Sequence, residues 1–440
     1  MKGPFLPIVV AALALAGLPS AAFAQGSPAK SPMTGPPAKI SVSADGATIF
    51  VVGRITENTF SEFLDVTRAA PKAKTVSLAS AGGELMGGYV MGNLVRLLKL
   101  NTHVDYSCLS ACTLVFGAGV ERTLGPDGQL GYHQSYRILP SGASEAAADF
   151  TNEATFAKLI AGDKRFTFGG GSDSLTVHAM GKLGVSQDFL RKVLQTPPEA
   201  MWFPDNARLI AENIVTRVLA PGEPAPPPPP GLRTREEFAA GLQQRPYWRA
   251  LAKAEPALFE ELLLQLWRME NIAADTRIEE ARARDRADER LAPRRATSSD
   301  EALDRFAQYI GAWSRMAEKY GFPYCNTPIV QPPGFEDEAI SLRAAADDVF
   351  AALYDSLGQV APLDEGKARG IMIRNSGRLI AAGSPVGPRP ADPVAGCRAD
   401  ERAVQAIAAL EPKYRAQVLR ASITLTTIAD AKDRAAKSKP

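Results

Sequence analysis

Residues 102–118, which read THVDYSCLSACTLVFGA, place a strand pattern directly before a helix pattern. Thr102 to Tyr106 carries the strand signal, and the small residues from Ser110 to Ala118 predict a helix. Ser110 therefore stands at a strand-to-helix junction, where a serine commonly serves as an N-cap. The start of a helix also offers free N–H groups and a dipole that favours an anion. Ser110 is therefore also a candidate nucleophile.

Strand and helix patterns alternate on both sides of this junction. We predict strands over Ala47–Ile55, Thr75–Leu78, Gln129–His133 and Asn213–Leu219, and helices over Glu57–Ala69, Leu85–Leu100 and Asp205–Glu212. This β-β-α succession is compatible with an α/β core built on parallel strands.

Serine needs a base to remove its proton, and histidine is the usual one because its pKa lies near neutral pH. The chain has 3 histidines. His103 lies inside a strand pattern, where a structural or edge-exposed role is expected, and His178 has no evident partner. His133 ends a strand, which places it at the same end of the sheet as Ser110. His133 is therefore the best base available.

A pair of glycines, Gly82 and Gly83, follows Ser80 and Ala81 at the end of another strand. Such a pair is most often a turn. Because glycine has no Cβ, the same backbone is also free to aim an N–H at a developing oxyanion. The amide of Ala111 would supply the second donor.

Three segments together resemble the Clp protease proteolytic subunit and the wider Clp/crotonase superfamily. They are Ser80-Ala81-Gly82-Gly83 with the glycine-rich helix start after it, Ser110-Ala111, and the strand that ends at His133. The resemblance spans about residues 47–220. It is closest to secreted bacterial members whose nucleophile motif is Cys-x-Ser-Ala-Cys. Their fold class is α/β, with a Clp/crotonase-like β-β-α spiral core.

The resemblance implies specific roles. Ser110 would be the nucleophile, His133 the general base, and the amides near Gly82 or Gly83 and of Ala111 the oxyanion hole, for acyl transfer followed by hydrolysis. One departure is Ala81, where the protease subunit usually has proline, which alters turn stiffness more than chemistry.

The third member of the triad is a larger departure. The family position for its aspartate falls near Met201, which is not an acid. Glu199 is the nearest carboxylate, with Asp205 and Asp188 as fallbacks. Each is equally consistent with a helix terminus or the surface.

The first residues carry a targeting signal: Lys2, an apolar run from Phe5 to Leu18, and Ala22-Phe23-Ala24 before Gln25. We predict a cleaved signal peptide over 1–24 and a periplasmic or secreted protein. A permanent anchor is the alternative, but the apolar run is shorter than the ~20 residues of a spanning helix.

The 4 cysteines fall into two pairs. Cys108 and Cys112 flank Ser110, where they would form a disulfide or pack as buried thiols; a redox role is the outside option. Cys325 and Cys397 lie far along the chain and could join two loops. Disulfides persist in exported proteins.

Proline-rich stretches divide the chain into domains. Linkers over 25–38 and 221–232, the second containing Pro226–Pro230, separate a hydrolase domain over 39–220 from a second domain over 233–440. The second domain is rich in helical patterns, which we predict over Glu236–Met269, Ala273–Arg290, Ser299–Tyr320, Glu336–Leu357 and Asp400–Ala435. The charged stretch Arg277–Arg295 favours a solvated helix with i,i+4 pairs.

Charge narrows the functional classes. Lys plus Arg total 50 against 48 Asp plus Glu, a balance that does not favour nucleic acid as a partner.

We predict no cofactor and no metal, a polypeptide as substrate or partner, and self-association by resemblance only. The leading hypothesis is an exported serine hydrolase of the peptidase kind. The rivals are a silent Clp-like binding or assembly module and a crotonase-like acyl-thioester enzyme; export away from coenzyme A and the Ser110/His133 pair disfavour the latter.

Overall fold

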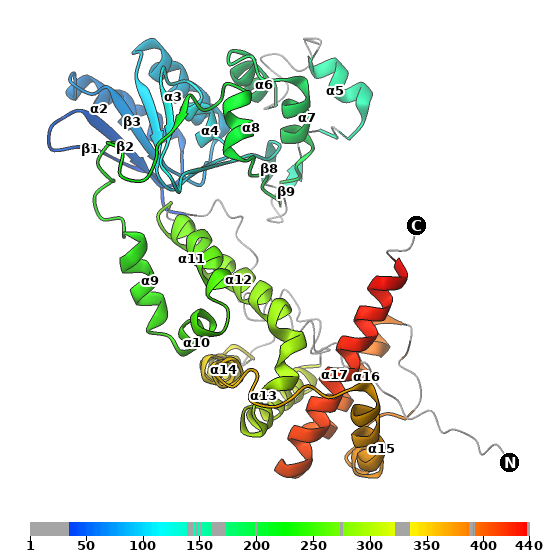
Figure 1. Ribbon diagram of the computed structural model, residues 1–440. Helices are drawn as coiled ribbons and strands as arrows, with labels where there is room; N and C mark the ends of the chain where they lie inside the picture. Colours follow the sequence, from blue (N-terminus) through cyan, green and yellow to red (C-terminus); the bar gives the residue numbers. More distant parts are fainter. Residues whose placement is uncertain are drawn as a thin grey trace. The chain divides into compact units, whose positions relative to one another are not determined.

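The chain folds into two compact units, which Figure 1 shows in a computed structural model. The structure describes residues 35–138, 144–146, 148–149, 151–160, 173–198, 200–272, 276–321, 335–386, 390 and 392–437. We call Ala29–Arg235 with Leu264–Thr276 the α/β unit, and Glu236–Leu263 with Arg277–Pro440 the helical unit. The predicted signal peptide lies outside the described residues.

The α/β unit is built on a sheet with the order β1-β2-β3-β4-β6-β10. Its strands are β1 Lys39–Val42, β2 Thr48–Val52, β3 Thr75–Ala79, β4 Asn101–Val104, β6 Arg122–Leu124 and β10 Arg217–Val218. Only β1 is antiparallel to its neighbour; the other pairs are parallel. The predicted α/β class with parallel strands is therefore confirmed.

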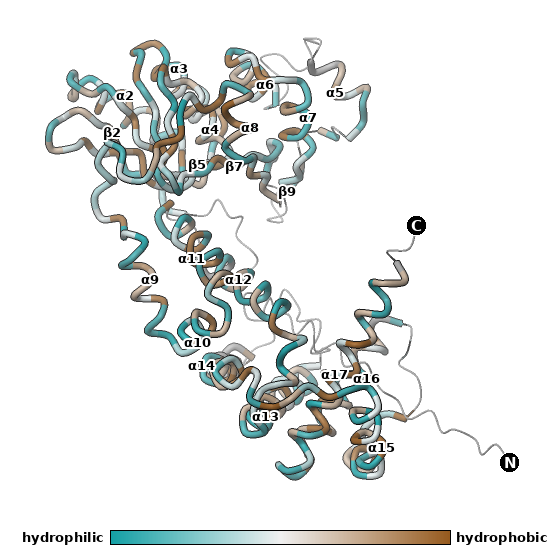
Figure 2. The backbone as a smooth tube through the Cα atoms, in the orientation of Figure 1, coloured by the Kyte–Doolittle hydropathy of each residue, from teal (hydrophilic) through white to brown (hydrophobic). Residues whose placement is uncertain are grey.

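Helices α2 Glu57–Ala69 and α3 Leu85–Leu97 follow β2 and β3 as predicted. The strand expected over Asn213–Leu219 shrinks to Arg217–Val218, because Asn213 has a φ of +54° and belongs to the turn after α8 Asn206–Ala211. Figure 2 shows hydrophobic residues concentrated along the sheet of this unit. The buried core includes Ile49, Val51 and Val76 of the strands.

A second, two-stranded sheet carries the predicted junction. β5 Ser107–Leu109 pairs in parallel with β7 Gln129–Gly131, and β5 leads into α4 Cys112–Phe116. An isolated parallel bridge joins Ser80 to Cys108 and so ties the end of β3 to this small sheet. The remaining elements of this unit are β8 Tyr136–Ile138, β9 Ser144–Ala146, α5 Glu153–Ile160, α6 Asp173–Gly181 and α7 Gln187–Gln195.

The end of α11 Pro256–Glu270 also belongs to the α/β unit, although the sequence assigns all of 233–440 to the helical domain. Arg268 explains why: its Nε donates to the carbonyl of Asp127 at 2.7 Å, and its Nη1 donates to Gln129 Oε1 at 3.0 Å. Trp267 stacks against Tyr106 with ring centroids 4.9 Å apart. A composition shift cannot reveal such contacts.

The helical unit holds α9 Arg235–Gln243, α10 Pro246–Ala254, most of α11, α12 Thr276–Leu291, the 3₁₀ helix η2 Ala292–Thr297, α13 Asp300–Lys319, α14 Phe335–Asp355, α15 Glu365–Ala381, α16 Pro393–Ala408 and α17 Pro412–Lys437. The pattern over Glu236–Met269 is three helices, because Pro246 and Pro256 each open a new one. Pro412 likewise divides the pattern over Asp400–Ala435. α15 was not predicted.

The charged stretch Arg277–Arg295 is not the solvated helix that the sequence favours. Ala283, Ala287 and Leu291 of this stretch are fully buried. Arg284 does make an i,i+4 pair with Glu280, at 3.0 Å. Its guanidinium, however, also lies 4.3 Å from the centre of the Tyr247 ring. The stretch is therefore part of the core of the helical unit.

Candidate functional site

Parallel pairing brings Ser110 and His133, the predicted nucleophile and base, to the same end of the small sheet. Leu109 of β5 lies in register with Gly131 of β7, so Ser110 and His133 both follow the carboxyl ends of these strands. The Ser110 N–H donates to the carbonyl of Gly131 at 2.8 Å. Carboxyl ends of parallel strands are where α/β proteins gather functional side chains.

The backbone at Ser110 is left-handed, with a φ of +52°. This conformation costs a residue with a Cβ about 1–3 kcal/mol, so the surrounding structure must impose it. Thr113 holds the turn, because its N–H and its hydroxyl both donate to the carbonyl of Ser110, at 2.9 and 2.7 Å. A disulfide between Cys108 and Cys112 spans the same turn. The buried-thiol alternative is thereby excluded.

Ser110 does not act as the N-cap of α4. Ala111 occupies the N-cap position, and no side chain caps this helix. Among the described residues, the Ser110 hydroxyl has no hydrogen-bond partner. The Ser110 oxygen therefore does not cap α4, which was the structural role that the sequence allowed for it.

The two glycines differ in what their N–H groups do. The Gly82 N–H donates to Ser80 Oγ at 3.0 Å. Gly83 forms a parallel bridge with Ile55, in which Gly82 O accepts from the Ile55 N–H and the Glu84 N–H donates to Ile55 O. Within the described part of the chain, the N–H of Gly83 has no acceptor. Gly83, rather than Gly82, therefore offers a free donor.

Close packing at Gly82 holds this segment against Ser110. A Cβ on Gly82 would lie 2.7 Å from Ser110 Cβ and 3.1 Å from the nitrogen of Ala111. The Ala111 N–H also has no acceptor among the residues that the structure describes. Gly83 and Ala111 thus provide two free backbone donors on segments that pack beside Ser110, an arrangement suited to an oxyanion.

The imidazole of His133 is buried, with 9% of the residue exposed. Its Nδ1 lies 2.8 Å from the carbonyl oxygen of Gln134. Because a carbonyl oxygen can only accept, Nδ1 carries the proton in the neutral ring, and Nε2 is the basic nitrogen. The backbone therefore selects the tautomer that a general base requires.

The carboxylates proposed for the triad lie elsewhere or outside the description. Glu199 is not among the described residues. Asp205 caps α8 by accepting the Arg208 N–H at 2.7 Å, and Asp188 pairs with Arg208 Nη2 at 2.8 Å. Asp205 and Asp188 therefore have the helix-terminus and surface positions that the sequence allowed as the alternative.

Sequence reasoning missed a buried acid near the base. Asp173, the first residue of α6, is 2% exposed and accepts the Ser135 N–H at 3.1 Å. Burial raises the pKa of Asp173 to about 6, against the lowering effect of its hydrogen bonds with Ser135. The only signal in the sequence was an acid at the start of a helix-like stretch.

A cavity of about 550 Å³ connects these groups, a size typical of ligand sites. Ser110, His133 and Gly83 line it. Much of the remaining wall is apolar or aromatic: Leu85, Met86, Leu114, Tyr132, Tyr136, Met180 and Val193. Arg54, Glu57 and Glu84 add charge. The cavity thus joins a serine, a histidine and a free backbone donor to space for an organic substrate.

His103 and His178, also singled out in the sequence, are not among the described residues that line this cavity. His103 is fully buried in β4, where Nδ1 lies 2.8 Å from Thr123 Oγ1, so it is structural rather than edge-exposed. His178 is exposed on α6, with its ring centroid 6.0 Å from that of Tyr89. Cys397 is disulfide-bonded, and Cys325 lies outside the described residues.

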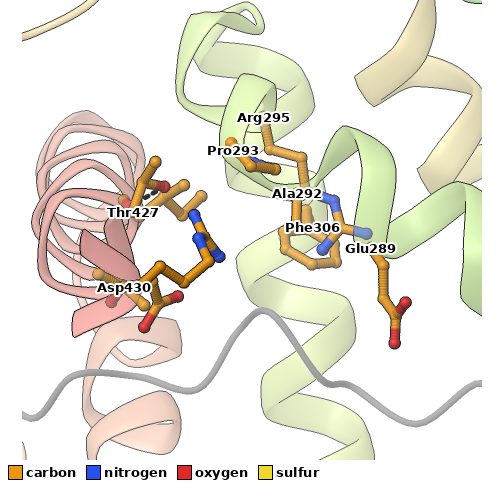
Figure 3. A pocket seen from close by; sticks show the side chains of 10 residues that line it. Glu289, Ala292, Pro293, Arg295, Phe306, Thr427 and Asp430 are labelled. Atoms are coloured by element: carbon orange, nitrogen blue, oxygen red, sulfur yellow. Dashed lines mark hydrogen bonds between the residues drawn. The ribbon is translucent and has the colours of Figure 1, made fainter. Parts of the chain in front are cut away.

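A smaller cavity of about 80 Å³ lies in the helical unit, as Figure 3 shows. Arg295, Phe306 and Thr427 are among its lining residues, and the Arg295 guanidinium lies 5.4 Å from the centre of the Phe306 ring. None of the described residues in its wall is a serine, cysteine or histidine, so among these residues there is no pair like Ser110 and His133.

In the part of the chain that the structure describes, no group of three or more His, Cys, Asp or Glu side chains is arranged to hold a metal ion. None of the described helices combines the length and the apolar character needed to cross a bilayer.

Comparison of the sequence with family models and with curated proteins finds no match in either set. Solved structures with similar folds include a point mutant of ClpP1 from Listeria monocytogenes, with 15% identity, a TM-score of 0.29, and coverage of 41% of this chain and 94% of that one. A peptidase from Plasmodium falciparum has 12% identity and a TM-score of 0.28, covering 39% and 95%.

A membrane-bound stomatin-specific protease, 1510-N, is similar at 14% identity with a TM-score of 0.28, over 39% of this chain and 77% of that one. These neighbours are peptidases of the Clp and stomatin-specific kinds. At such TM-scores the similarity carries no inference about function, which must come from the site itself.

Proposed function

We propose that this chain is an exported serine hydrolase of the peptidase kind, with a Clp/crotonase-like core. The observation that carries the proposal is one cavity lined by the left-handed Ser110, by Gly83 with its free N–H, and by His133, whose Nδ1 proton is held by the Gln134 carbonyl. These parts match the three needs of acyl transfer: a nucleophile, a base and an oxyanion hole.

In the proposed reaction, the Ser110 hydroxyl attacks the carbonyl carbon of a peptide bond as His133 Nε2 takes its proton. The N–H groups of Gly83 and Ala111 stabilise the negative oxygen of the tetrahedral intermediate. His133 returns the proton to the leaving amine, which departs and leaves an acyl ester on Ser110. Water, deprotonated by the same imidazole, then hydrolyses the ester.

Export and assembly are part of the proposal. A disulfide across the nucleophile turn suits an oxidising compartment, in keeping with a cleaved signal peptide and a periplasmic or secreted protein. Self-association is proposed by resemblance alone.

The first experiment is labelling of the mature protein with a fluorophosphonate, which reacts with activated serines. We expect the wild type to label, and Ser110→Ala and His133→Ala to lose labelling. Ser61→Ala, on the exposed face of α2, is the matched control and should label like the wild type. A folded wild type that does not label would refute the hydrolase and leave the silent binding or assembly module.

A second measurement separates the peptidase from other hydrolases. The wild-type enzyme, not treated with the probe, is tested on chromogenic peptide amides and on the corresponding esters. Release of the amine, lost in Ser110→Ala, is the expected result. Turnover of esters alone would contradict the peptidase assignment while keeping the serine mechanism.

A further inference from the structure

The imidazole of His133 and the carboxyl group of Asp173 are bonded to opposite ends of one peptide unit. His133 Nδ1 donates to the carbonyl oxygen of Gln134 at 2.8 Å. The N–H of Ser135 donates to Asp173 Oδ1 at 3.1 Å. Because the Gln134 carbonyl and the Ser135 N–H belong to the same planar amide, the acid and the base share that amide.

We propose that Asp173 is the positioning residue of His133, acting through the amide between Gln134 and Ser135 instead of touching the ring. This inference rests on the proposed function of Ser110 and His133. It assigns the orienting task to a carboxyl group far in sequence from Glu199, Asp205 and Asp188.

A carboxylate that accepts a hydrogen bond from the N–H of an amide polarises that amide. Its carbonyl oxygen then becomes a stronger hydrogen-bond acceptor. Charge-assisted hydrogen bonds are stronger than neutral ones, and hydrogen bonds in a chain polarise one another. Burial increases this effect, and both Asp173 and His133 are buried, with 2% and 9% of each residue exposed. The polarised Gln134 carbonyl then holds the Nδ1 proton more firmly and stabilises the imidazolium formed during catalysis.

The neighbouring groups keep the amide in place. The Gln134 N–H donates to the carbonyl of Thr196 at 2.9 Å, and Gln134 Nε2 donates to the carbonyl of Ala148 at 2.6 Å. Both anchors hold Gln134 and leave its own carbonyl to His133. Rotation of the amide is therefore opposed at Gln134 by these bonds and at Ser135 by Asp173.

The test measures two properties of the full mature chain. The first is the reaction of Ser110 with a fluorophosphonate, resolved into the maximal inactivation rate and the probe concentration at half-maximal rate. The second is the tautomer of the neutral His133 ring, read from its ¹⁵N chemical shifts. A purely structural role of Asp173 would not change the tautomer.

We expect Asp173→Ala to lower the maximal inactivation rate roughly a hundredfold, the size of effect that a misplaced catalytic group produces, with little change in half-saturation. Its His133 ring should lose the preference for the Nδ1–H form. Asp173→Asn keeps an acceptor for Ser135 but not the charge, so its rate should fall only about tenfold. Glu153→Ala removes an exposed carboxylate from the first turn of α5 and should match the wild type.

A folded Asp173→Ala variant with the wild-type rate and tautomer would overturn the proposal. Should that variant not fold, Asp173→Asn decides: a wild-type rate there overturns the proposal equally. Failure of the hydrolase proposal looks different, because the wild type would then not label at all. The NMR measurement still tests the link between Asp173 and His133 in that case.

Discussion

The core of the helical unit and the proposed site of the α/β unit partner their ionisable side chains differently. In the helical unit, the half-buried Arg284 lies between two acids, Glu280 at 3.0 Å and Asp347 at 2.7 Å. In the α/β unit, the hydrogen bonds of Asp173 and of His133 Nδ1 go to Ser135 and to the carbonyl of Gln134. Oppositely charged partners hold each other in the ionised form and so serve the packing of a core. Ionisable groups that have neutral hydrogen-bond partners beside a cavity remain able to exchange protons.

Positive φ serves different purposes at the proposed site and in the helical unit. Among the described residues of the helical unit, the glycines with positive φ are Gly321, Gly358 and Gly383; each lies within the few residues that follow a described helix, and a Cβ on any of them would meet nothing within 4 Å. Such glycines end helices. At the site, Ser110 adopts this conformation despite its Cβ, and the glycines beside it are packed against other backbone. Two other described residues of the α/β unit, Lys99 and Asn213, also have a Cβ and a positive φ, but Ser110 is the one of the three that lines the cavity.

The largest effect that we predict tests the charge-paired core. Asp288 is buried, accepts hydrogen bonds from Tyr247 and Tyr354, and lies 3.3 Å from Arg295 Nη2. Asp288→Ala leaves that buried arginine without its acid, so the free energy of unfolding should fall by about 3–5 kcal/mol. Denaturant titration measures it.

The matched control for this change is Glu301→Ala. Glu301 pairs with Arg305 on an exposed helix face, and such pairs contribute little. Equal losses in both variants would show that the buried pairing has no special weight. Wild-type labelling of Ser110 in folded Asp288→Ala would sharpen the contrast between the units.

Packed and open glycines give the next prediction. A Cβ on Gly88 of α3 would lie 2.4 Å from the carbonyl oxygen of Ala111, while Gly377 of α15 has nothing within 4 Å. Gly88→Ala should cost about 3 kcal/mol and slow Ser110 labelling, because the start of α4 must move. Gly377→Ala should stabilise by about 1 kcal/mol, the helix propensity of alanine. Thermal unfolding compares them, and equal shifts would contradict the prediction.

Local patterns predicted the parts of the fold that depend on local chemistry. The α2 helix has the bounds expected from its periodicity, and the succession of strands gave the parallel α/β class. The helical unit was harder, because a 3.6-residue pattern continues through Pro246 and Pro412 although each begins a new helix. Tertiary contacts decided the burial of Arg277–Arg295, which composition alone assigned to solvent.

At the site, the sequence indicated Ser110, His133 and the glycine pair because short motifs carry them. It could not decide which of Gly82 and Gly83 offers a free N–H, because that depends on the hydrogen bond from the Gly82 N–H to the Ser80 hydroxyl. It also missed Asp173. That residue reaches Ser135 only through folding, across 38 positions of the chain, and no local pattern reports such a contact.

The disulfide at the nucleophile turn offers a smaller effect. Cys108 and Cys112 are 4 positions apart in the sequence, and closing so short a loop in the unfolded chain is worth about 2 kcal/mol. The double variant Cys108→Ala/Cys112→Ala should lose about that much stability in denaturant titration. Its Ser110 labelling should slow as well, because Thr113 alone would then hold the left-handed turn. Unchanged stability and labelling would assign the disulfide no role in positioning Ser110.

The smallest effect concerns Glu401 of α16, the exception to charge pairing in the helical unit. It is 3% exposed, and its Oε1 has no hydrogen-bond partner among the described residues. Burial together with the nearby Glu318 raises the pKa of Glu401 to about 7, although Arg398 and Arg402 act to lower it. A carboxyl pKa raised by folding means that the folded state binds the proton more tightly. The resulting stability is full below the ordinary carboxyl pKa and is lost as pH rises through about 7.

Between pH 6 and pH 8 we therefore expect the free energy of unfolding to fall by roughly 1 kcal/mol on account of Glu401. Glu401→Gln should remove this dependence, because the amide cannot ionise beside Glu318. Glu365→Gln, whose carboxylate is exposed and paired with Lys432, is the control and should keep it. A pH dependence that survives in Glu401→Gln would have its origin in another group. Glu401 would then not share the raised carboxyl pKa that burial gives Asp173.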